Sequence, residues 1–124
     1  MKPRPETLSS STTKIPTGYG NLYVTIVEHE GKPVELFATI GKSGKSIMAK
    51  AEVVGRMVAL ALKHDIPIEE IIEELIDIRG DKSVPYKDTV IWSIPDAVGK
   101  LLKEKYGGKE NESTLEKESK DRGE

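Results

Sequence analysis

The chain has 124 residues, with 19 lysines and arginines against 21 aspartates and glutamates, two histidines and no cysteine. This length is typical of one domain. The absence of cysteine excludes a disulfide, a thiolate metal site, a thiyl radical and a cysteine nucleophile, and two histidines are too few for a histidine-rich zinc site. The net charge of −2 gives no electrostatic reason to bind nucleic acid.

Neither a membrane span nor a signal peptide is expected. No stretch approaches 18 consecutive apolar residues, and no apolar segment follows the basic N-terminus. The cytoplasm is therefore the expected location. A charged fraction of 32%, together with the lack of cysteine, also suits a thermophilic source.

Both ends of the chain differ in composition from the middle. Residues 1–14 are rich in proline, serine and threonine, which favours an extended lead-in. Residues 107–124 hold six acidic and four basic residues and one apolar residue, Leu115. Such a segment buries too little apolar surface to offset its conformational entropy, so we expect a disordered charged tail. The folded domain is then expected over residues 15–106.

An antiparallel β-hairpin is predicted at the start of this domain. Within residues 21–28, the apolar side chains Leu22, Val24 and Ile26 recur with the period of a strand. Residues 33–40 repeat the pattern after a short turn that contains glycine. A lone hairpin is marginally stable in water, so other elements must cover its apolar face.

Two predicted helices follow the hairpin. Residues 47–63 carry a broad apolar stripe, which is typical of a central buried helix. Gly55 in the middle of this helix disfavours helix formation relative to alanine, and we expect another element to approach closely there. Residues 66–80 form the second helix, with Gly80 as its expected C-terminal cap.

The third helix is predicted after a loop over residues 81–90. It begins near Ser93, because Ser93 and Asp96 have the residue types and the spacing of a capping box. The element order is β-β-α-α-α. The sequence therefore predicts an α+β fold in which a small antiparallel sheet packs on about three helices.

The segment GKSGKS lies between the second predicted strand and the first predicted helix. A phosphate-binding P-loop needs a glycine at position 39, where Thr39 stands, and a parallel sheet that this fold does not supply. A weaker anion site remains, built from two lysines and a helix N-terminus. The alternative is a flexible turn in which Ser43 or Ser46 caps the helix. The candidate residues for anion or nucleotide binding are Lys42, Ser43, Gly44, Lys45 and Ser46.

Structural roles are favoured for the other conspicuous side chains. Tyr19 is flanked by glycines, which indicates a tight turn. Trp92 is expected to be a buried anchor, and the positive form of His64 would suit the C-terminal end of the first helix. The glutamates within residues 69–74 repeat opposite an apolar stripe, which indicates a solvated face and not a pair of catalytic carboxylates. No set of catalytic residues is predicted.

Six segments follow one another in the order of a known family pattern. They are RPETL at 4–8, TGYGNLYVTI at 17–26, IGKSG at 40–44, AEVVGRMVALAL at 51–62, IEEIIEELIDIRG at 68–80 and SIPDAVGKLL at 93–102. Together they resemble the TSCPD domain. This domain is best known as the C-terminal module of adenosylcobalamin-dependent (class II) ribonucleotide reductases.

The resemblance implies four cysteines, and this chain has none of them. The corresponding positions are Tyr19, Ser46, Gly80 and Ile94. Four cysteines in those places would suggest a metal site, with zinc as the expected ion. Because all four are replaced, we predict neither a metal nor a redox thiol in this chain.

The resemblance also implies a function. We expect a stand-alone accessory domain related to ribonucleoside-diphosphate reductase and deoxyribonucleotide synthesis, which docks to a reductase large subunit or forms a homodimer and has no catalysis of its own. Adenosylcobalamin would belong only to the partner reductase, and no cofactor is expected in this chain. The second hypothesis is a small regulatory module that binds a nucleotide or phosphate through the GKSGKS loop. An independent enzyme is the third, and no residue set supports it.

Overall fold

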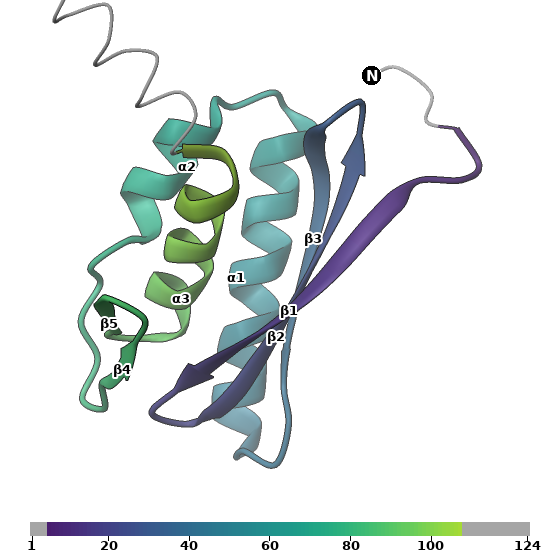
Figure 1. Ribbon diagram of the computed structural model, residues 1–124. Coiled ribbons are helices and arrows are strands. Elements are labelled where there is room, and N and C mark those ends of the chain that lie inside the picture. Colours follow the sequence, from purple (N-terminus) through teal and green to yellow (C-terminus); the bar gives the residue numbers. More distant parts are fainter. Residues whose placement is uncertain (1–4, 108–124) are drawn as a thin grey trace, which may run out of the picture.

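The computed structural model describes residues 5–107 (Figure 1). The expected tail therefore lies outside the described residues, apart from Gly107. Three strands are followed by two helices, a short hairpin and a third helix, which confirms the α+β class. The elements are β1 (Ser9–Thr17), β2 (Gly20–His29), β3 (Lys32–Ile40), α1 (Lys45–Lys63), α2 (Ile68–Leu75), β4 (Val84–Tyr86), β5 (Thr89–Ile91), α3 (Ile94–Leu102) and a π-helical turn (Lys103–Gly107).

The predicted hairpin is formed by β2 and β3. Its two central turn residues are Glu30 and Gly31, whose φ angles of 53° and 77° are both left-handed. This is the backbone conformation that a two-residue hairpin turn requires. Val24 lies opposite Ala38 in the register, so the apolar side chains of both strands share one face of the sheet.

A third strand, β1, corrects the prediction for the lead-in. Residues 9–14, expected to precede the domain, pair with β2, and the order in the antiparallel sheet is β1-β2-β3. Ile15 of β1 is almost fully buried, whereas the first residues of the strand are exposed. Threonines suit such a half-exposed strand, and the absence of apolar alternation over residues 9–14 concealed it.

The predicted loop over residues 81–90 contains a second, smaller hairpin. β4 and β5 pair antiparallel, with Tyr86 opposite Thr89. Lys87 in the turn between them has a φ of 53°. Three-residue strands are too short to produce a clear alternation in the sequence, so this part of the prediction was wrong.

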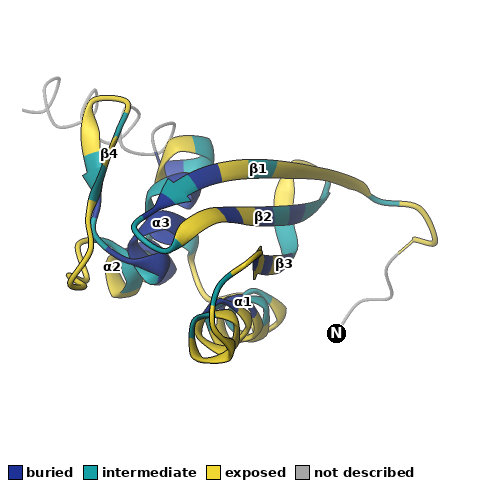
Figure 2. Cartoon of the chain, turned by 90° about the horizontal axis from the view of Figure 1, so that it is seen from below, coloured by how far each residue is buried: buried dark blue, intermediate teal, exposed yellow. Residues whose placement is uncertain are grey.

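α1 runs alongside β3 (Figures 1 and 2). At Gly55 the two backbones approach so closely that a Cβ atom would lie 3.0 Å from the backbone nitrogen of Ala38. The expected close approach at Gly55 is therefore confirmed. Gly55 weakens the helix locally but allows it to pack directly on the strand.

α2 is shorter than predicted, because it ends at Leu75 and not near Gly80. The amide of Ile76 makes the last helical hydrogen bond, and the next amide, that of Asp77, donates to Asp96 Oδ1 at 2.7 Å. Asp77 has a φ of 62°, which no helix can continue. A side chain distant in sequence therefore helps to end α2, and Gly80 is not its cap.

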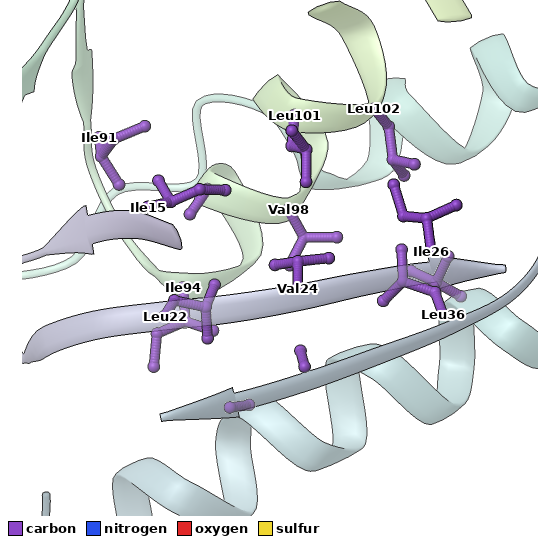
Figure 3. Close-up of a cluster of buried hydrophobic side chains, with 14 of the residues drawn as sticks. Ile15, Leu22, Val24, Ile26, Leu36, Ile91, Ile94, Val98, Leu101 and Leu102 are labelled. Atoms are coloured by element: carbon purple, nitrogen blue, oxygen red, sulfur yellow. The ribbon is translucent and has the colours of Figure 1, made fainter. Parts of the chain in front are cut away.

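α3 begins as predicted. The Oγ of its N-cap residue, Ser93, accepts a hydrogen bond from the Asp96 amide at 3.1 Å. Val98 of α3 points toward Val24 of β2 in the core (Figure 3). The most deeply buried apolar side chains come from the sheet and from residues 91–102, and they include Ile15, Leu22, Val24, Ile26, Leu36, Ile91, Ile94, Val98 and Leu102.

The opposite face of the sheet is open. The exposed fractions of Tyr23 and Phe37 on this face are 42% and 54%. Buried and exposed residues accordingly alternate along the middle of the sheet (Figure 2). The molecule is thus a two-layer arrangement in which the helices cover one face of the sheet only.

Candidate functional site

Four loop segments meet at one end of the domain, and the four positions where the family resemblance implies cysteine lie in them or in the first turn of the helix that follows. They are the turn between β1 and β2, the loop between β3 and α1, the loop after α2 and the residues just before α3 (Figure 1). We call this region the loop junction. It lies at the lower end of the molecule in Figure 1.

Tyr19 is in the tight turn that the flanking glycines predicted. The Oγ1 of Thr17 accepts from the Tyr19 amide at 3.1 Å and donates to the Gly20 carbonyl at 2.7 Å. Gly20 has a φ of 121°, which few other residues adopt. The Ser43 hydroxyl donates to the Tyr19 carbonyl at 2.7 Å, so this turn is tied to the loop before α1.

The Tyr19 side chain connects the same turn to the loop after α2. Its hydroxyl donates to Asp81 Oδ1, and this hydrogen bond raises the pKa of Tyr19 and lowers the pKa of Asp81. The Lys82 ammonium lies 5.3 Å from the centre of the Tyr19 ring, within the range of a cation–π contact. A Cβ atom at Gly18 would clash with Lys82, so the two backbones are in direct contact.

Gly80 lies against the residues that precede α3. Its amide donates to the Trp92 carbonyl at 2.9 Å, and a Cβ atom at this position would lie 3.0 Å from the same oxygen. The Ser93 hydroxyl donates to the Ile78 carbonyl at 2.6 Å. Gly80 is thus fixed by a close backbone contact with Trp92, two residues before α3, and this role was not predicted from the sequence.

Asp96 is the buried polar centre of this region. Its exposed fraction is 0%, and its carboxylate accepts from the amides of Asp77 at 2.7 Å and Trp92 at 2.8 Å. The Lys100 ammonium donates to Asp96 Oδ2 at 3.0 Å and also to the Val90 carbonyl. Two amides and one ammonium therefore compensate the desolvation of this carboxylate.

From the sequence, Asp96 was predicted only as part of a capping box. In that motif its carboxylate would accept from the amide of the N-cap residue, Ser93. Instead it accepts from Trp92 and from Asp77, which belongs to a different segment. Lys100, four residues after Asp96 on the same helix, was the available sign of a paired carboxylate.

The residues at the four positions do not fit a zinc ion. The Tyr19 hydroxyl is engaged by Asp81, Gly80 has no side chain, and the Ile94 side chain is apolar and buried. Ser46 is exposed in the first turn of α1. Zinc sites in proteins use thiolate, imidazole or carboxylate ligands. Among residues 5–107, no group of three or more histidines, cysteines, aspartates or glutamates is arranged to hold a metal ion.

The GKSGKS loop is adjacent to the junction. Gly44 is the N-cap of α1 and no side chain caps this helix, so capping by Ser43 or Ser46 is excluded. Lys42, Lys45 and Ser46 are exposed, whereas the Ser43 hydroxyl is directed at Tyr19. The structure therefore brings the two lysines and the start of α1 to one exposed loop, but engages one of the two hydroxyls in the fold.

Structural roles were also predicted for Trp92 and His64. Trp92 is half-buried and stacks under the Arg79 guanidinium, whose carbon lies 4.1 Å from the ring centre, so it is an anchor with one accessible face. His64 is the C-cap of α1, as expected, and is exposed.

A second feature of the surface is a groove between α1 and α2, with a volume of about 620 Å³. We call it the α1–α2 groove. Its accessible apolar residues are Val53 and Met57 from α1, Ile66 before α2 and Ile78 after it. Glu70, Glu73 and Glu74 of α2 also line it. The glutamates that were expected on a solvated face therefore border an apolar surface.

A comparison with protein families identifies the family of the chain. The model of the TSCPD domain matches residues 1–106. The chain belongs to the TSCPD family. This domain is known from ribonucleotide reductases. No curated protein and no solved structure matches the chain.

For this TSCPD domain, the family match covers every strand and α-helix described above and all of the π-helical turn except Gly107. It includes β1, the strand that the composition did not suggest. Within residues 5–107, no helix has both the length and the apolar character needed to cross a membrane.

Proposed function

We propose that this TSCPD domain is a docking module that associates with a ribonucleotide reductase in the cytoplasm and performs no catalysis of its own. The observation that carries the proposal is the apolar surface of the α1–α2 groove. The exposed fractions of Val53 and Met57 are 53% and 59%, although both belong to the longest helix of the domain. Apolar side chains grouped in this way on a soluble domain are typical of a protein-binding surface.

The chemistry of the chain supports binding rather than reaction. Ribonucleotide reduction by the radical route requires thiols, and this chain has no cysteine. The loop junction is occupied by hydrogen bonds that hold the fold together, such as Tyr19 to Asp81 and Asp77 to Asp96. Adenosylcobalamin and the reactive cysteines therefore belong to the partner in this proposal.

Direct binding to the purified large subunit of a class II reductase from the same organism tests the proposal. We expect saturable binding to the immobilised TSCPD domain and co-elution of the two proteins in size-exclusion chromatography. A Met57→Asp variant should bind more weakly, because it places a charge on the apolar surface. The absence of binding at micromolar concentrations would remove the reductase from the proposal.

A homodimer is the other form of docking that we consider. β1 is an edge strand of the sheet, and the outer edge of such a strand can pair with a second copy. Sedimentation equilibrium of the chain alone distinguishes the two forms, because a homodimer has twice the monomer mass without any reductase present.

The alternative function is binding of phosphate or a nucleotide by the GKSGKS loop. Its supporting observation is that Lys42 and Lys45 are exposed beside the start of α1, whose first turn has no acidic residue. Calorimetry with ATP, dATP and inorganic phosphate tests it. Heat of binding that disappears in the double variant Lys42→Ala, Lys45→Ala would support this alternative, and the absence of heat with all three compounds would reject it.

A further inference from the structure

We infer that the α1–α2 groove binds the apolar face of a basic amphipathic helix from a partner protein. This inference rests on the proposed docking function and adds to it the surface and the chemistry of the partner. Two properties of the groove carry it: accessible apolar side chains from three segments, and a one-sided distribution of charge.

The apolar part of the groove is formed by side chains whose outer surfaces are exposed to solvent. Val53, Met57, Ile66 and Ile78 are between 41% and 59% exposed. Beneath them, Val58 and Ile71 are buried and belong to the core. The groove is therefore continuous with the core, so a ligand seated there would pack against core side chains.

The charged part of the groove is entirely acidic. Glu70 is followed by Glu73 and Glu74 at the i+3 and i+4 positions, so the three carboxylates lie on one face of α2. Lysine, arginine and histidine are absent from the described residues that line the groove. Within residues 5–107, none of the three glutamates takes part in an ion pair. A partner with lysine or arginine beside its apolar contact residues would complement this charge.

The same charges argue against a second copy of this chain as the occupant. A second copy docked through the same groove would bring three more glutamates into the interface and no basic groove residue to pair with them. The segment 108–124 of this chain is also a poor occupant, because it has one apolar residue and a net negative charge. The complementary surface is therefore expected on a different protein.

A helix suits the groove better than an extended strand. The groove lies between two helices, whose backbone groups are hydrogen-bonded internally, so it offers side chains and not a free strand edge. A helix meets such a surface through apolar residues at i, i+3, i+4 and i+7, and it presents basic residues on both sides of that stripe.

Nuclear magnetic resonance of the whole chain tests the location. The probe is a synthetic helix of about 15 residues with leucines at i, i+3, i+4 and i+7 and lysines at the other positions. The control peptide has the same leucines and lysines in a shuffled order that leaves no apolar stripe on a helix. We expect the first peptide to shift the methyl resonances of Val53, Met57, Ile66 and Ile78. Shifts centred on the open face of the sheet, or equal shifts with both peptides, would overturn the inference.

Charge reversal tests the chemistry. The double variant Glu70→Lys, Glu73→Lys should bind the leucine–lysine helix at least about tenfold more weakly at low salt. The matched control, Glu30→Lys with Asp88→Lys, makes the same change of net charge in two exposed turns and should bind within about twofold of the unmodified chain. Met57→Asp should also weaken binding about tenfold. If both double variants weaken binding equally, binding depends on the net charge of the chain and not on the groove, and the inference is overturned.

The reductase experiment separates this inference from the proposed function. If the large subunit binds the unmodified chain and the Met57→Asp variant equally well, the reductase docks elsewhere and the groove inference fails while the proposed function stands. If the large subunit binds neither form but the model helix binds the groove, the proposed reductase partner fails and the groove inference stands.

Discussion

At the level of single residues, Asp96 has the most consequential position in the domain. Its buried carboxylate joins the end of α2, the residue before the α3 cap and Lys100. Removing one partner from such a buried set leaves the other groups without a hydrogen bond. The resulting loss of folding stability is larger than the net stabilisation that the hydrogen bonds provide. The stability of the loop junction therefore depends strongly on this one side chain.

The first prediction concerns this carboxylate. Asp96→Asn keeps the size of the side chain but replaces one acceptor by a donor and removes the charge that faces Lys100, so we expect a loss of about 3 kcal/mol in the free energy of unfolding. Urea denaturation measures it. Asp88→Asn, in an exposed turn, is the control and should change stability by less than about 0.5 kcal/mol. Equal stability of the Asp96 and Asp88 variants would contradict the assigned role.

A second prediction concerns the ionisation of Tyr19. Its pKa lies above the ordinary value of 10.0, mainly because its hydroxyl donates to Asp81. Asp81→Asn removes the negative charge and weakens that hydrogen bond, so Tyr19 should ionise at lower pH in this variant. Titration of the tyrosine ring carbons by nuclear magnetic resonance measures the change.

Glu28→Gln provides the matched control for this titration. The pKa of Tyr106 is raised by burial and by its hydrogen bond to Glu28, so this variant should move Tyr106 and leave Tyr19 unchanged. The raised pKa of Tyr19 also implies a stabilisation that is complete below pH 10 and is lost as the pH rises through the folded-state value. No shift of Tyr19 in Asp81→Asn would exclude the hydrogen bond in solution.

At the level of elements, glycines set how closely the helices pack. A Cβ atom at Gly99 of α3 would lie 2.8 Å from Leu75 Cβ and 3.0 Å from the Ile76 amide nitrogen. If a side chain were present at position 99, contacts this short would force the end of α2 away from α3. α2 has only eight residues, so its position depends on this contact more than on its own helical stability.

We therefore predict that Gly99→Ala destabilises the domain by about 1–3 kcal/mol, even though alanine favours helix formation by about 1 kcal/mol. Gly41→Ala is the control, since a Cβ atom there meets nothing within 4 Å. Thermal unfolding of both variants measures the difference. A stabilised Gly99→Ala variant would mean that α2 and α3 are not in close contact.

Some of the helices and strands were predicted from the sequence and others were not. The β2–β3 hairpin, α1 and the start of α3 follow from local periodicity and capping, and all three were correct. The end of α2 was wrong, because a contact with Asp96, nineteen residues after Asp77, overrides the local pattern. β1 was missed because serine and threonine dominate its first residues, and the β4–β5 hairpin was missed because three-residue strands are too short to show an alternation.

The candidate site was also predicted only in part. The family resemblance identified Tyr19, Gly80 and the residues near Ser93 in the sequence, and the structure places their segments together. The α1–α2 groove was not predicted, because no local pattern reveals that Val53 and Ile78 border the same surface. Such a surface depends on how α2 packs against the rest of the molecule.

At the level of the whole molecule, we infer that packing and polar side-chain contacts hold the loop junction together without a metal. The turn at Tyr19 is tied to Ser43 and Asp81, and Gly80 is tied to Trp92. If the four cysteines that the family resemblance implies were present, a metal ion would connect these segments instead. The fold of this chain should therefore be independent of zinc.

The melting temperature and the metal content of the purified chain show whether a metal holds the loop junction together. We predict the same cooperative unfolding transition with and without excess EDTA, and a zinc content far below one ion per chain by elemental analysis. One tightly bound zinc per chain, together with loss of the folded state in EDTA, would contradict the account.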